Sequence, residues 1–153
     1  MLDEVELMKY HNDFVDITDE NLNLSVLIDK VRTEDSGAIC TFSGTTRNYF
    51  VVDGIKRKVV SLEYESYTPM AIKEMQKTVK LARTKFQDIN KIAVQHKIGK
   101  CLVGEESVCI AVSSSHRKVS FLACEFIIDE LKRTCPIWKK EIYEDGSFNW
   151  KEN

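Results

Sequence analysis

The sequence predicts an α+β fold built on a largely antiparallel sheet, with two main helices and a short helix near the N-terminus. Two long segments, 69–86 and 117–134, repeat apolar residues every three or four positions, as one face of a helix does. Around them, short segments rich in β-prone residues come in pairs. Paired strands with helices interspersed are typical of an α+β layer. The paired segments are 37–47 with 59–67, and 91–99 with 106–115.

The first part of the chain contains the short helix and the first strand pair. Apolar residues recur at helical spacing in 23–32, and Asn23 is placed to cap this helix. The segment 37–47 begins at a glycine, and 59–67 alternates apolar with polar residues. We predict that these two strands pair with each other around a connection that contains the Asp-Gly turn at 53–54.

The middle of the chain contains the first long helix and two more strands. Thr68 is predicted to cap a helix whose first residue is Pro69, because proline is favoured at that position. Two strands follow, 91–99 and 106–115, and a turn at Gly104 separates them.

The last part of the chain contains the second long helix and a hairpin. Ser114 or Ser115 is available to cap the helix of 117–134, and Pro136 stops it. The residues after Pro136 predict two short strands around the Glu-Asp-Gly-Ser turn at 144–147. Five apolar residues of the helix are expected to face the core: Val119, Leu122, Phe126, Ile127 and Leu131.

Length and composition indicate one domain, residues 1–153, with a single core. Hydrophobic residues make up 43% and charged residues 30%, so a disordered or fibrous chain is excluded. The chain has no run of 18 apolar residues, and its first residues lack the basic flank and apolar stretch of a signal peptide. We therefore expect a cytosolic protein that does not enter a membrane.

The net charge of −2 conceals two regions of opposite sign. Residues 1–35 carry ten acidic and three basic side chains, a net charge of −7, and the remaining 118 residues carry +5. The total argues against a nucleic-acid-binding protein, which would be strongly basic. The basic body suggests an anionic ligand, although charges scattered for solubility remain the alternative.

The five cysteines form no C-x-x-C pair and mostly lie in apolar runs, so we expect buried free thiols. A zinc site is disfavoured because no histidine lies at ligand spacing from a cysteine. Cys101 or Cys109 beside His96 is disfavoured as a nucleophile, since apolar burial raises the pKa of a thiol.

Three local features could carry chemistry. His116 and Arg117 lie at a predicted helix N-terminus, where backbone N–H groups and two cations suit an anion; a capped helix with solvated cations is the alternative. Lys132, Lys139 and Lys140 lie around an apolar Pro-Ile-Trp segment that could desolvate a lysine and lower its pKa; a solvated face is the alternative. Arg47 ends a strand rich in small hydroxyl residues.

These features occur together and in order in a known family. The chain resembles the large (catalytic) subunit of molybdopterin synthase over roughly residues 22–151. The succession of SHR, LK fifteen residues later, and then PIWKKE is its most specific part. The motifs that carry the resemblance are TFSGTTRN (41–48), LEYESYTPMA (62–71), HKIG (96–99), SSSHR (113–117) and FIIDELKRTCPIWKKE (126–141).

The resemblance implies an α/β hammerhead fold and a sulfurtransferase that inserts two sulfurs into cyclic pyranopterin monophosphate, making the dithiolene of molybdopterin. In this family a small ubiquitin-like subunit carries the sulfur as a C-terminal Gly-Gly thiocarboxylate, and its tail enters a pocket of the large subunit. Two large subunits form a central dimer within a heterotetramer, and the resemblance implies no metal and no organic cofactor. The alternative is a non-catalytic module that binds a ubiquitin-like tail or a phosphorylated ligand with the same cations.

The resemblance also implies roles for residues at matching positions. Lys132 and Lys139 match two pocket lysines, expected to transfer protons and stabilise the intermediate, and Glu141 matches a carboxylate beside the second of them. The other matches are substrate-binding positions: Phe42 and Arg47 at the strand end, with Arg47 expected on the pterin phosphate, and His116 and Arg117, expected to complete the pocket across a dimer interface.

Overall fold

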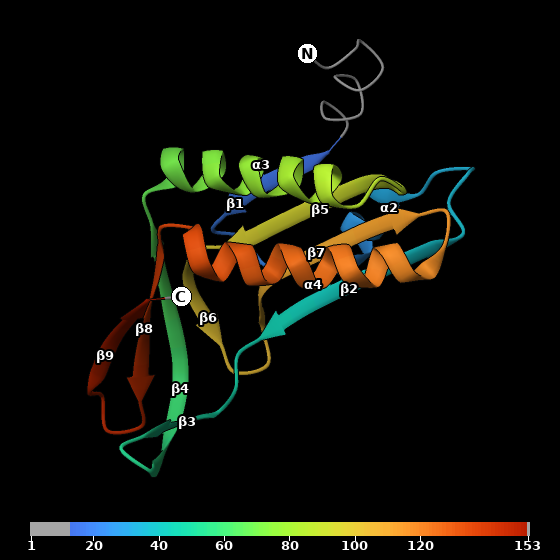
Figure 1. The fold of residues 1–153 in the computed structure, drawn as a ribbon. Helices are drawn as coiled ribbons and strands as arrows, with labels where there is room; N and C mark the ends of the chain where they lie inside the picture. The colour runs from blue at the N-terminus through green and yellow to red at the C-terminus, as the bar shows by residue number, and fades with distance from the viewer. Residues whose placement is uncertain (1–12, 153) are drawn as a thin grey trace.

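The computed structural model describes residues 13–152 and confirms a mixed α+β fold (Figure 1). This part of the chain forms nine strands and three helices. The first sheet has the order β1-β5-β7-β2, in which only the β1–β5 pair is parallel. Its strands are β1 (Phe14–Thr18), β5 (Ile89–Lys97), β7 (Glu106–Ser114) and β2 (Ala38–Thr45).

The second sheet is antiparallel and is built on the long strand β4. Its main order is β3-β4-β8-β9, and β6 pairs with the C-terminal half of β4. The strands are β3 (Tyr49–Val52), β4 (Ile55–Ser66), β6 (Gly99–Leu102), β8 (Ile137–Tyr143) and β9 (Phe148–Glu152).

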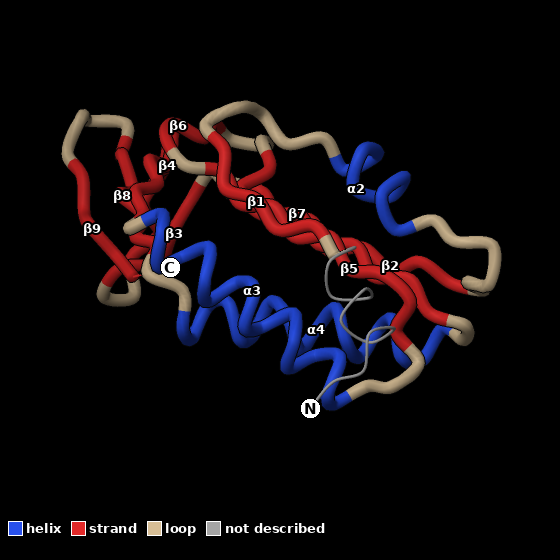
Figure 2. Tube along the Cα trace, turned by 90° about the horizontal axis from the view of Figure 1, so that it is seen from above, coloured by secondary structure: helices blue, strands red, loops and turns tan. Residues whose placement is uncertain are grey.

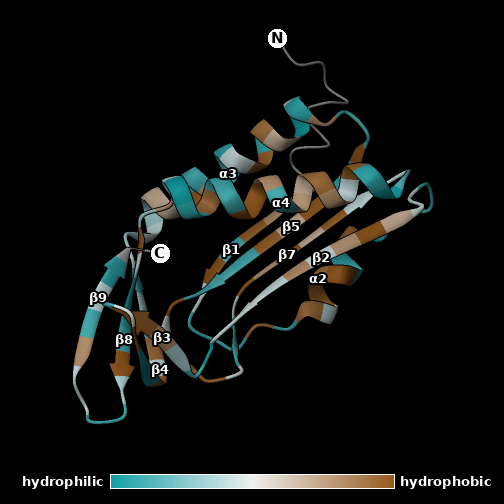
Figure 3. Cartoon of the chain, turned by 60° about the horizontal axis from the view of Figure 1, so that its bottom comes forward, coloured by the Kyte–Doolittle hydropathy of each residue, from teal (hydrophilic) through white to brown (hydrophobic). Residues whose placement is uncertain are grey.

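Helices cover both faces of the first sheet. The long helices α3 (Thr68–Lys85) and α4 (Arg117–Thr134) lie side by side on one face, and the short helix α2 (Leu24–Val31) lies on the other (Figures 1 and 2). Strand β7 is therefore buried at every position after its first. Apolar residues are concentrated on the strands between these helices, as Figure 3 shows.

The three helices lie where the sequence places them, but two of the predicted caps are wrong. The Asn23 side chain accepts a hydrogen bond from the backbone N–H of Ser25 at 3.1 Å, as expected of an N-cap. Helix α3 includes Thr68, so the cap position falls to Tyr67 and has no side-chain cap. The cap position of α4 is His116, also without a side-chain cap, because the buried hydroxyl of Ser114 donates instead to the His116 carbonyl at 2.6 Å.

The predicted pairing of the strands at 37–47 and 59–67 is wrong. The turn at 53–54 exists and has positive φ at both residues, but it joins β3 to β4. Strand β2 instead pairs with β7, more than sixty residues away in sequence. Sequence alternation does not identify a non-local partner, and here residues 46–48 carry the chain from one sheet to the other.

Two smaller expectations also differ from the structure. The connection before Gly104 contains a further strand, β6, which was not predicted. Leu122 is 41% exposed, because the buried stripe of α4 runs through the smaller residues Ala123 and Cys124.

The terminal hairpin, β8 and β9, lies where it was predicted. None of the described helices is both long and apolar enough to cross a membrane.

Candidate active site

A cavity of about 470 Å³ lies where the end of β2 meets the second sheet and the last turns of α4. Its position brings together segments from six separate parts of the sequence. Apolar, neutral polar and cationic side chains all contribute to its wall. The residues that line it include Phe42, Ser43, Arg47, Phe50, Tyr64, His96, Ser107, Lys132 and Lys139.

Three cations converge on this cavity from different elements. Arg47 follows the end of β2, Lys132 lies in the last turn of α4, and Lys139 lies on β8. Phe42, on β2, provides an apolar wall beside them. The structure therefore brings together four of the residues that the sequence predicted for the site.

Burial lowers the pKa of Lys139 and is the largest influence on it. The carboxylate of Glu141 acts in the opposite direction, whereas the positive charges of Lys132, Lys151 and Arg47 lower the pKa further. A lysine in such surroundings exchanges protons closer to neutral pH than an exposed lysine does.

The ring of Phe50 lies close to three cations, Lys139, Arg47 and Lys151. The Lys139 ammonium is 4.8 Å and the Arg47 guanidinium 4.9 Å from the ring centroid, and the Lys151 ammonium is 5.5 Å from it. The negative face of an aromatic ring attracts cations at such distances. Phe50 therefore helps to hold like charges close together.

Glu141 lies next to the cavity rather than on its wall. Its side chain is fully buried, and its Oε1 accepts a hydrogen bond from the Tyr143 hydroxyl at 2.9 Å. The Lys151 ammonium is 3.3 Å from the same oxygen. Glu141 is thus the buried anion beside Lys139 that the sequence predicted, but its ion pair is with Lys151.

The cavity also has a neutral polar wall that the sequence did not predict. Burial raises the pKa of Tyr64, so its phenol stays protonated, and the ring packs edge-on against His96 with centroids 5.1 Å apart. Burial lowers the pKa of His96 to about 4. Its Nδ1 is 2.8 Å from the Lys97 carbonyl, so neutral His96 donates from Nδ1. The motifs around Tyr64 and His96 were noted, but nothing local indicated that both side chains face this cavity.

His116 and Arg117 do not reach the cavity of their own chain. They lie at the first residues of α4, whereas Lys132 lies at its other end, about 22 Å away along the helix axis. Both side chains are exposed. Their expected part in the site therefore depends on a second copy of the chain.

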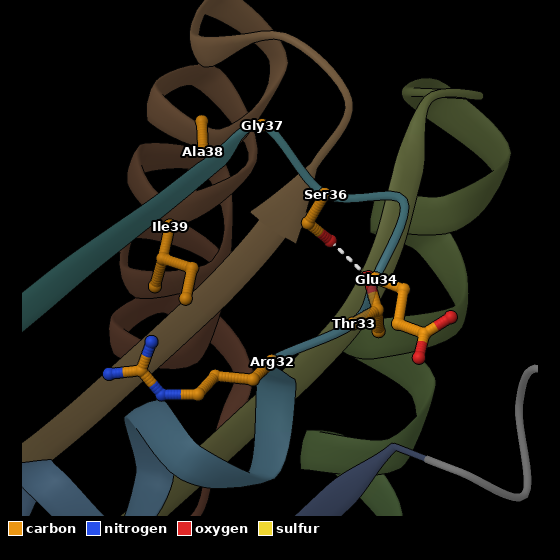
Figure 4. A pocket seen from close by; sticks show the side chains of 7 residues that line it. All are labelled: Arg32, Thr33, Glu34, Ser36, Gly37, Ala38 and Ile39. Atoms are coloured by element: carbon orange, nitrogen blue, oxygen red, sulfur yellow. Dashed lines mark hydrogen bonds between the residues drawn. The ribbon is translucent and has the colours of Figure 1, made fainter.

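A wider opening lies elsewhere, along the connection from α2 to β2 (Figure 4). Its side chains do not converge: Arg32 and Glu34 point in different directions, and the Arg32 guanidinium binds Asp29 at 3.0 Å. A hydrogen bond joins Thr33 to Ser36. This opening lacks the grouped cations of the first cavity and is not the candidate site.

All five cysteines are free thiols; three of them are buried, as predicted, whereas Cys40 and Cys135 are only partly buried. Burial raises the pKa of Cys101, and burial together with Glu106 raises the pKa of Cys109 to about 12. Neither thiol is activated as a nucleophile. Within residues 13–152 no three His, Cys, Asp or Glu side chains are grouped so as to hold a metal ion.

Comparison with known proteins gives concordant matches. A family model described as MoaE protein matches residues 17–134. The chain is 46% identical over 142 residues to the molybdopterin synthase catalytic subunit of Dictyostelium discoideum, covering 92% of this chain and 87% of the relative. It is 48% identical over 141 residues to the protein of the same name from Arabidopsis thaliana, covering 91% and 68%.

Solved structures share the fold. Molybdopterin synthase from Staphylococcus aureus superposes with a TM-score of 0.81 at 33% identity, covering 90% of this chain and 96% of the other. A chain from the complex of subunits 1 and 2 of molybdopterin-converting factor from Helicobacter pylori superposes with a TM-score of 0.70 at 20% identity, covering 91% and 90%.

Proposed function

Because the chain belongs to the MoaE protein family, we propose that it is the catalytic subunit of a molybdopterin synthase. It is a sulfurtransferase of molybdenum cofactor biosynthesis. Its substrate is cyclic pyranopterin monophosphate, and its product carries the dithiolene of molybdopterin.

The observation that supports this function best is the convergence of Arg47, Lys132 and Lys139 on one cavity. The substrate carries a phosphate, and a thiocarboxylate sulfur donor is also an anion. Three cations in a partly enclosed space suit two anionic reactants, because their attraction is stronger there than in bulk water.

Each sulfur insertion exchanges one oxygen of the pterin side chain for sulfur. The thiocarboxylate sulfur forms a C–S bond to the substrate as the substrate C–O bond breaks, which joins donor and substrate as a thioester. Water then cleaves the acyl C–S bond of this thioester, so the sulfur stays on the substrate and the donor is released as a carboxylate. Negative charge develops on the departing oxygen, where Lys139 and Lys132 stabilise it and supply protons. Arg47 binds the phosphate as it is released from its cyclic ester. Phe42 lines the apolar side of the pocket.

The sulfur donor is a small ubiquitin-like subunit with a C-terminal Gly-Gly thiocarboxylate. Its narrow, anionic tail is suited to a cavity of about 470 Å³ whose wall includes Arg47, Lys132 and Lys139. The H. pylori chain of the same fold was itself solved in a complex of subunits 1 and 2.

Two copies of this chain form the centre of a heterotetramer, and each site receives His116 and Arg117 from the other copy. The separation of these two residues from their own cavity supports this arrangement. The cavity takes its walls from both sheets, which supports a chain that acts as one domain. We place the assembly in the cytosol.

The function is tested by mixing the purified protein with cyclic pyranopterin monophosphate and the thiocarboxylated small subunit, and by measuring dithiolene product. Lys132→Ala and Lys139→Ala should abolish the conversion and leave the circular dichroism spectrum unchanged. A small subunit with an ordinary C-terminal carboxylate is the matched control and should give no product. Binding of both reactants without product would instead indicate a non-catalytic module, and unchanged turnover in both lysine variants would contradict the assigned site.

A further inference from the structure

Three charged side chains lie on one face of the hairpin formed by β8 and β9. Lys139 and Glu141 are two residues apart on β8, so their side chains point to the same side of the sheet. Lys151 on β9 lies directly opposite Lys139 in the antiparallel register. Directly opposed residues also share a face, so Lys151 and Lys139 both lie beside Glu141.

Glu141 forms its ion pair with Lys151 and not with Lys139. The Lys151 ammonium is 3.3 Å from Oε1 of Glu141, whereas no ion pair of 4.0 Å or less joins Lys139 to any described carboxylate. Oε2 of Glu141 is buried and accepts no hydrogen bond from the described residues. A buried carboxylate oxygen without a donor is costly, so Oε2 would attract any ammonium that could reach it.

Charged and titratable groups face Lys139 from each neighbouring element. Arg47 approaches from the connection after β2, Lys132 from α4 and Lys151 from β9. On β8 itself lies Glu141, with the Tyr143 hydroxyl bound to it. The neutral phenol of Tyr64 lies on β4, in register with Lys139. Glu141 is therefore the only anion among these groups, so the lysine that pairs with it affects the charge of the Lys139 amine.

We propose that Lys151 is a positioning residue for Lys139: by pairing with Glu141, it keeps this carboxylate from binding the Lys139 amine and leaves that amine directed into the cavity. This inference rests on the proposed function of Lys139. Lys151 does not line the cavity, and it acts through Glu141 and through its own charge.

Removal of the Lys151 charge acts on Lys139 in two ways that have the same sign. A positive charge near the Lys139 amine is lost, and the carboxylate of Glu141 becomes available to it. Both changes favour the protonated amine, so the pKa of Lys139 should rise in Lys151→Met. Glu141→Gln removes the only nearby anion, so it should lower that pKa.

The direct test is a pH titration of the Lys139 side chain by NMR in protein labelled at the lysine ε-carbon, with the signal assigned from its absence in Lys139→Met. The titration should shift to higher pH in Lys151→Met and return toward the parent in Lys151→Arg. Lys151→Gln repeats the test if the methionine variant is unstable. An unchanged Lys139 titration in a folded Lys151 variant overturns the inference.

The matched control is Lys140→Met. Lys140 lies on β8 next to Lys139 but on the opposite face, where its ammonium is 3.9 Å from Glu63 and 3.9 Å from the centroid of the Phe148 ring. This variant removes the same charge from the same strand and should leave the Lys139 titration unchanged. An equal shift in Lys140→Met would show a general charge effect and would also overturn the inference.

Turnover separates this inference from the proposed function. In the reaction with thiocarboxylated small subunit, Lys151→Met should lower kcat at neutral pH by about fivefold with little change in KM, and move the pH profile in the direction of the Lys139 titration. If the titration shifts but no variant and no parent protein makes dithiolene, the proposed function fails and the arrangement of Lys151 stands. Full activity with an unmoved pH profile in Lys151→Met contradicts the positioning role.

Discussion

Replacement of Lys139 by methionine should have opposite effects on activity and on stability. Methionine has nearly the length of the lysine stem and no charge, so the variant removes the ammonium from the cavity and keeps the packing of β8. Lys139 lies 4.8 Å from the Phe50 centroid, among three cations that disfavour its positive charge. The charge is thus unfavourable in the absence of substrate and favourable only when anions are bound.

The expected magnitudes follow from this arrangement. Loss of one preorganised donor that stabilises developing charge costs about 10²- to 10³-fold in kcat, or roughly 3–4 kcal/mol. The free energy of unfolding should be unchanged or rise by up to about 1 kcal/mol, since an unfavourable buried charge is removed. Because the folded-state pKa of Lys139 lies below its usual value of 10.5, this gain is present at neutral pH. It shrinks as the pH rises through the lowered pKa and vanishes above 10.5, where both states bind no proton.

The assays are dithiolene formation from the thiocarboxylated small subunit and urea unfolding at neutral and at alkaline pH. Lys140→Met serves again as the control and should keep parental turnover. Activity of Lys139→Met within twofold of the parent would refute the catalytic role. A variant that is clearly less stable than the parent at neutral pH would refute the electrostatic reasoning, whatever its activity.

Three other outcomes are expected. Arg83→Met should lower the free energy of unfolding by about 3–5 kcal/mol, because it leaves the buried carboxylate of Asp13 without the guanidinium that binds it at 2.5 and 2.6 Å. Urea denaturation measures this loss, and adding Asp13→Asn to the same chain should recover part of it. Coexpression of Lys139→Met and Arg117→Met chains, each inactive alone, should restore about a quarter of parental activity if each site combines residues of two copies, whereas no recovery would contradict a site shared between copies. Cys109→Ala should keep kcat within about twofold, since the proposed reaction takes its sulfur from the small subunit and not from a thiol with a pKa of about 12; a complete loss of turnover in the folded variant would contradict that proposal.

Local sequence patterns were sufficient to predict the helices. The spacing of apolar residues and Pro136 placed α4 at Arg117–Thr134, and Asn23 marked the start of α2. These features depend on residues within one or two turns of each other. The resemblance to a family then identified Lys132 and Lys139 as a pair, which the structure brings to one cavity.

Strand pairing could not be obtained in the same way. The turn at 53–54 was identified correctly, but the strand paired with β4 across it is β3 and not β2, which pairs with the distant β7. Local alternation does not distinguish these partners, because the choice depends on packing between segments far apart in the sequence. The helix caps were misplaced for a related reason: the Ser114 hydroxyl is buried at the end of β7 and already has an acceptor.

The sequence by itself determined where the helices and the terminal hairpin lie, and its resemblance to the family predicted that Arg47, Lys132 and Lys139 share one pocket. Only the tertiary structure decided that Tyr64 and His96 face this pocket, that Glu141 is buried against Lys151, and that Arg117 lies far from Lys132 in the same chain. The physical reason is how far apart in the sequence the interacting residues lie. Helix formation depends on neighbours along the chain, whereas burial and charge pairing depend on residues that become neighbours only after the two sheets and α4 have packed together.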